Sequence, residues 1–145
     1  MITRALAKWL DAASLVNYQP DTDAGDCFLE HLPDAPGAAV QIFSTGGNPL
    51  PAAASWGYDE PTVQLMVRGL PDDPLGPGAR ALALYGALQG LRQVTLDASG
   101  EDEVFVVVCE SLQTAPVNIG SDEKGRYRYT LNFALHVRAL TAHRD

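Results

Sequence analysis

The chain has 145 residues, of which 46% are hydrophobic and 19% charged, a composition typical of one globular domain. Its 18 acidic and 10 basic residues give a formal net charge of −8, which argues against autonomous binding to nucleic acid or to an anionic membrane, because both are bound through lysine and arginine. The longest uninterrupted apolar run, Val104–Cys109, is far too short to cross a bilayer.

The first half of the chain predicts one helix, three strands and a long loop. Apolar residues recur at steps of four and three from Ile2 to Val16, so we expect a helix over about Thr3–Val16. Alternating runs predict three strands, Cys27–Leu32, Ala39–Ser44 and Thr62–Arg68. The aperiodic stretch Thr45–Glu60 is expected to be a loop of a length that is often functional.

The second half predicts a helix and two long strands. A proline-rich connector, Leu70–Gly78, precedes a helix expected over about Ala79–Arg92. Glu103–Gln113 is apolar on both faces, which indicates a buried, central strand, and Arg126–Ala139 alternates almost without error. This order predicts an α+β fold, with a mostly antiparallel sheet of about five strands packed by two helices and a long C-terminal β-hairpin.

The last predicted strand is unusually long. Fourteen residues would span about 46 Å, at about 3.3 Å per residue, whereas an ordinary strand has about five or six residues. Such a strand must bend, protrude as a ribbon, or find its remaining partners on another subunit. We therefore expect the protein to associate.

The sequence offers no catalytic or metal-binding arrangement. Neither His-x-x-x-His nor Cys-x-x-Cys occurs, and no phosphate-binding loop or nucleophile elbow is present. An acidic run beginning at Asp21 resembles a calcium loop, but Gly25 and Leu32 stand where ligands are needed. We therefore expect a protein that is not an enzyme and has no cofactor or metal. A small α+β ligand-binding module or enzyme remains the alternative from another class.

The two cysteines, Cys27 and Cys109, both lie in strand-like runs. We expect buried free thiols, with a disulfide as the alternative.

The C-terminal strand is basic, although the protein is acidic. No acidic residue occurs between Lys124 and Arg138, and this stretch holds four of the ten basic residues. Two interpretations stay open. The polar side of the strand is either a solvent-facing surface or a patch complementary to an acidic neighbour, most simply another copy of the chain.

Several segments together resemble the phage tail terminator and minor capsid families of long-tailed, siphovirus-type phages. The resemblance runs roughly from Phe28 to Val137. It is carried by five stretches, Thr62–Gly69, Ala81–Leu88, Ser111–Pro116, Ile119–Arg126 and Tyr129–Phe133.

The resemblance implies a structural virion protein with a single tail-terminator-like domain over residues 1–145. Such proteins form a hexameric ring at the head-proximal end of the tail tube, stop tube polymerisation and complete the tail for head–tail joining. The expected partners are other copies of the chain, the tail tube protein and the head–tail connector or stopper at the neck. Genomic DNA would pass through the lumen without specific binding, and assembly would occur in the bacterial host cytoplasm. A head–tail stopper or another neck ring protein is the nearest alternative.

Under this resemblance the candidate contact residues lie on the long loop and the basic strand. Large amphipathic side chains commonly anchor interfaces, although this loop could equally fold back over its own core. The candidates for subunit or tube contacts are Trp56, Tyr58, Arg126, Arg128, Asn132, His136 and Arg138.

Overall fold

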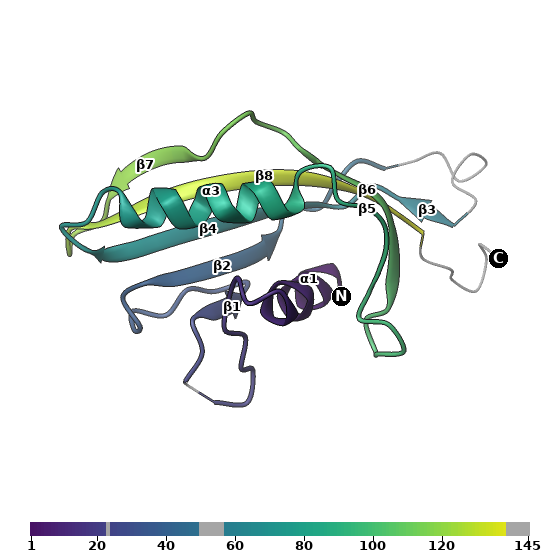
Figure 1. Ribbon diagram of the computed structural model, residues 1–145, viewed down its shortest axis with the longest axis horizontal. Coiled ribbons are helices and arrows are strands. Elements are labelled where there is room, and N and C mark those ends of the chain that lie inside the picture. Colours follow the sequence, from purple (N-terminus) through teal and green to yellow (C-terminus); the bar gives the residue numbers. More distant parts are fainter. Residues whose placement is uncertain (23, 50–56, 139–145) are drawn as a thin grey trace.

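The computed structural model describes residues 1–22, 24–49 and 57–138, and within these ranges eight strands form one curled sheet with two helices on its concave face (Figure 1). The helices are α1 (Ile2–Ala12) and α3 (Gly76–Leu88). The strands are β1 (Cys27–Leu29), β2 (Ala39–Ser44), β3 (Tyr58–Asp59), β4 (Thr62–Pro71), β5 (Arg92–Leu96), β6 (Val104–Ser111), β7 (Val117–Ser121) and β8 (Arg126–Arg138).

The predicted α+β class with a mostly antiparallel sheet is confirmed. The main order is β1-β2-β4-β8-β6-β5, and only the β1–β2 pairing is parallel. The predicted number of about five strands is too low, because β3, β5 and β7 were not expected. All three are short, and most side chains of β5 and β7 are exposed, so their sequences lack the alternation that marks a half-buried strand.

Several predicted elements end at other residues than expected. Helix α1 stops at Ala12 because Ser14 has a left-handed backbone, with φ of 60°. Strand β1 ends early for the same reason, since Glu30 has φ of 67°. Helix α3 begins at Gly76, where proline in the first turn is tolerated, and it ends at Leu88 rather than at Arg92.

Strand β8, not β6, is the centre of the sheet. One of its edges pairs with β4, from Arg126 opposite Pro71 to Ala134 opposite Thr62, and then with β3. The other edge pairs with β6 and then with β7. The strand curves along its length (Figure 1), and its partners come from the same chain. Its length is therefore no longer an argument for association with another subunit.

The core lies between the helices and the concave face of the sheet. The alternate β8 residues Leu131, Phe133 and Leu135 are fully buried, with Leu6 and Leu84 of the two helices in the same cluster. Cys27 and Cys109 are buried free thiols, as expected, and burial raises the pKa of each to about 12. In the ranges described above, no helix is long and apolar enough to span a membrane.

Candidate functional site

The convex face of the sheet carries the polar side of β8. Because side chains alternate along a strand, Arg126, Arg128, Asn132, His136 and Arg138 all lie opposite the residues that enter the core. Neither helix covers this face, and β8 runs along its whole length (Figure 1). Among the other predicted contact residues, Tyr58 lies in β3, and Trp56 is outside the described residues.

Arg126 and Lys124 are used inside the molecule. The Arg126 guanidinium is buried and forms ion pairs with Asp34 at 3.0 Å and Asp122 at 2.8 Å. Lys124 pairs with the same Asp34 carboxylate. Hydrogen bonds from Lys124 and Arg126 hold the pKa of Asp34 below its usual range. This end of the basic strand therefore fixes residues 33–37, the turn before β2.

A second arginine, Arg68 on β4, holds the same turn. It is only 5% exposed, and its guanidinium donates hydrogen bonds to four backbone carbonyls. The acceptors are Pro33 O at 2.7 Å, Pro36 O at 2.7 Å, Gly37 O at 2.8 Å and Asp34 O at 3.3 Å. Burial, with a contribution from nearby Arg126, lowers the pKa of Arg68. Arg68 was not among the predicted contact residues, because the sequence pattern marks it only as the end of a strand.

Gln113 bridges the break between β6 and β7 along β8. Its side-chain Oε1 accepts hydrogen bonds from the backbone N–H and the side-chain Nδ2 of Asn132, at 3.1 and 2.9 Å. Its Nε2 donates to the carbonyl of Thr130 at 2.8 Å. The amide therefore imitates a peptide group of a neighbouring strand. Asn132, a predicted contact residue, is engaged in this internal bridge.

The described residues supply fewer polar contacts to Arg128, His136 and Arg138. The Arg138 guanidinium lies over the ring of Tyr58, 5.9 Å from its centroid, and the two residues are opposite each other in the sheet. His136 Nε2 is 3.5 Å from a Glu110 carboxylate oxygen. The Nε of Arg128 is buried and has no hydrogen-bond partner among the described residues. The structure thus brings Tyr58 and Arg138 together and leaves Arg126 at the far end of β8.

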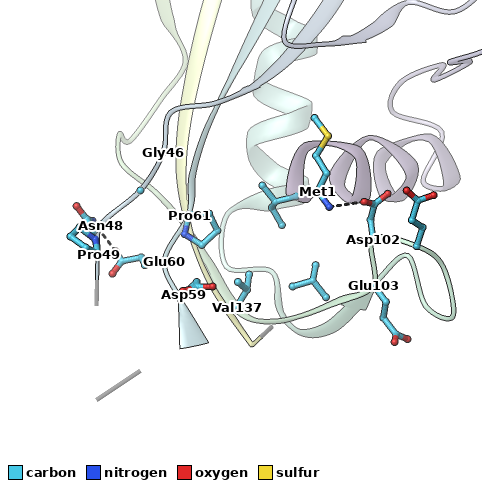
Figure 2. A pocket seen from close by; sticks show the side chains of 14 residues that line it. Met1, Gly46, Asn48, Pro49, Asp59, Glu60, Pro61, Asp102, Glu103 and Val137 are labelled. Atoms are coloured by element: carbon cyan, nitrogen blue, oxygen red, sulfur yellow. Dashed lines mark hydrogen bonds and ion pairs between the residues drawn. The ribbon is translucent and has the colours of Figure 1, made fainter. Parts of the chain in front are cut away.

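A pocket of about 570 Å³ lies where the turn between β5 and β6 approaches the segment before β4 (Figure 2). Asp102 on its wall accepts a hydrogen bond from the Met1 amino group at 2.6 Å and pairs with Arg4, and these cations hold its pKa well below the usual range. Opposite it, Glu60 Oε1 accepts a hydrogen bond from Asn48.

The chemistry of this pocket is acidic. The lining residues that the structure describes include five carboxylates and no Ser, Cys, His or Lys, so they supply no nucleophile paired with a base. Across the described ranges, no cluster of three or more His, Cys, Asp or Glu residues could hold a metal ion.

A family model described as bacteriophage tail terminator protein matches residues 9–138, a range that contains all eight strands and α3. No curated protein matches the chain.

Proposed function

The chain belongs to the bacteriophage tail terminator family, and on that basis we propose that it forms a ring, expected to be hexameric, at the head-proximal end of the tail tube. There it stops polymerisation of the tube protein and joins the tail to the connector or stopper of the neck. Membership itself gives the protein a structural role as a component of the phage tail. The match over residues 9–138 carries the proposal, because it names a terminator rather than another neck protein.

The uncovered face of the sheet supports a role in assembly. With Arg126 and Asn132 engaged internally, the predicted contact residues left on this face for a partner are Arg128, His136 and Arg138. In a protein of net charge −8, the two arginine side chains suit an acidic partner surface, such as another copy of the chain. Tyr58 adds an aromatic ring beside Arg138.

The overall charge also fits a ring through which DNA passes. We propose that the genome moves through the lumen without specific binding, since a net negative protein lacks the lysine and arginine excess needed to hold phosphates. Assembly would take place in the cytoplasm of the bacterial host, where the tube and neck proteins are made.

A capping assay tests the proposal. Purified protein is added to tube protein during polymerisation, and the tube lengths and ends are measured by negative-stain electron microscopy. We expect shorter tubes with a ring at one end, at far fewer copies of this protein than of tube protein. Tubes that grow to their usual length with bare ends would contradict the proposal.

An Arg128→Glu variant tests the convex face in the same assay. Light scattering on the free protein shows whether the substitution also changes the oligomer. Because Arg128 is on the face left open by the helices, we expect loss of ring formation with an unchanged circular dichroism spectrum. If the variant forms rings of unchanged size that still cap tubes, the convex face is not part of the proposed interface. Asp21→Asn, an exposed change of charge in the segment between α1 and β1, serves as the control.

A further inference from the structure

Helix α3 lacks the polar outer face that a surface helix normally has. Of its 13 residues only Arg80 is charged, and that guanidinium pairs with Asp26 at 2.8 Å. Leu82 is nevertheless 58% exposed, and Leu75, directly before the helix, is 79% exposed. Three small residues complete the exposed side, Ala79, Ala83 and Gly86. A helix that is apolar all round is normally buried, so the outer side of α3 has the composition of an interface.

A second exposed apolar patch lies on the opposite face of the sheet. Val117 of β7 is 48% exposed and pairs with Thr130, whose side chain is on the convex face. Ile119, two residues further along β7, is 44% exposed. Arg128, two residues from Thr130 along β8, borders this patch. The patch is therefore apolar, with the basic side chain of Arg128 on its β8 side.

The helix patch has a rim of the opposite charge. Asp72 and Asp73 lie just before α3, close to Leu75, and Asp72 is exposed. The two patches are thus complementary in both respects, since apolar side chains can face apolar side chains while carboxylates face Arg128. They also belong to opposite faces of the sheet, of which only one is covered by helices (Figure 1).

From this complementarity we infer that the outer side of α3 in one copy docks on the convex face of the sheet, around Val117 and Ile119, in the next copy. The inference rests on the proposed ring and specifies the contact that builds it. Two different patches in contact make a head-to-tail interface, the kind that builds a ring when its rotation closes. A contact of α3 with α3 would instead give a two-fold dimer and would leave the acidic rims facing each other.

Site-specific cross-linking tests this arrangement. Leu82→Cys is combined with Ile119→Cys, and separately with Val117→Cys, and each protein is treated with a short bismaleimide and run on a denaturing gel. The native thiols of Cys27 and Cys109 are buried and have raised pKa values, so they react little. We expect each double variant to give a ladder of cross-linked multimers, and each variant with one added cysteine to stay monomeric on the gel.

A charge substitution provides an independent readout. Leu82→Lys, on an exposed position that tolerates the change in the fold, should raise the protein concentration needed for ring formation by at least about tenfold. Ala12→Lys, also exposed and helical, is the matched control and should leave it unchanged.

The outcomes separate the inference from the proposed function. Dimers cross-linked through Leu82→Cys alone would overturn the inference while the terminator role stands. So would rings of the double-cysteine variants that give no ladder, together with ring formation that Leu82→Lys does not weaken. Failure of the wild-type protein to form rings in solution or on tube ends contradicts the proposed function itself.

Discussion

Replacing Arg68 by alanine should destabilise the protein strongly, although the residue is remote from the hydrophobic core. Its guanidinium makes three short hydrogen bonds to the carbonyls of the 33–37 turn, at 2.7, 2.7 and 2.8 Å. At about 1 kcal/mol net for each bond, the loss is about 3 kcal/mol, and the fourth, longer bond adds little. With a urea dependence of about 2 kcal/mol/M, the unfolding midpoint should fall by about 1.5 M.

Two variants make this prediction specific, each measured by urea unfolding followed by circular dichroism. Arg68→Lys keeps the charge but loses the planar guanidinium with its several donors, so its free energy of unfolding should be about 1–2 kcal/mol lower than that of the wild type. Arg128→Ala, at the position opposite Arg68 in the sheet, removes an arginine that holds no turn and should cost less than about 1 kcal/mol. A free energy of unfolding for Arg68→Ala within about 0.5 kcal/mol of the wild-type value would refute this prediction.

Three further substitutions test other contacts. Gln113→Ala should lower the free energy of unfolding by about 1–2 kcal/mol and speed hydrogen exchange at the backbone amide of Asn132, since that N–H loses its acceptor. Unchanged exchange would argue against the bridge. Pairing lowers the pKa of Asp102, so its stabilising effect is full above about pH 4 and is lost as the pH falls towards the folded-state value. Asp102→Asn should therefore destabilise at pH 7 by more than at pH 3, and an equal loss at both would contradict this. Gly47→Ala should lower the melting temperature, because φ is 120° and the new Cβ would lie 2.3 Å from Glu60 O; an unchanged melting temperature would show that the turn adapts.

The elements that the sequence predicted are those whose side chains divide between core and solvent. Strand β2 matches its predicted range, Ala39–Ser44, and β8 begins at its predicted first residue, Arg126, and continues to Arg138, the last residue that the structure describes. Strands β5 and β7 were not predicted, because most of their side chains are exposed to solvent and show no alternation. Backbone pairing with β6 and β8 holds them in the sheet. Their formation depends on backbone hydrogen bonds to distant residues, and a local pattern contains no such information.

The internal roles of polar residues were harder to predict than the elements. The alternation in β8 correctly placed Arg126 and Asn132 on the polar side, but it could not show that Asp34 and Gln113 would meet them there. Arg68 continues the polar side of the predicted strand Thr62–Arg68, but its place beside the turn with two prolines follows only from the pairing of β4 with β2. Turn carbonyls need donors, and a buried guanidinium offers several.

The basic residues between Lys124 and Arg138 form two groups with different functions. Lys124 and Arg126, at its beginning, are neutralised by Asp34 and Asp122, so they stabilise the fold and contribute little to the field that a partner meets. Arg128 and Arg138 have no carboxylate partner among the described ion pairs, and the Nε of Arg128 is buried without an acceptor. A buried donor without an acceptor is unfavourable in the free protein, and an approaching carboxylate would satisfy it. In the proposed ring, we therefore expect the free energy that favours association to come mainly from the convex face around Arg128, near the start of β8 and beside the apolar residues of β7.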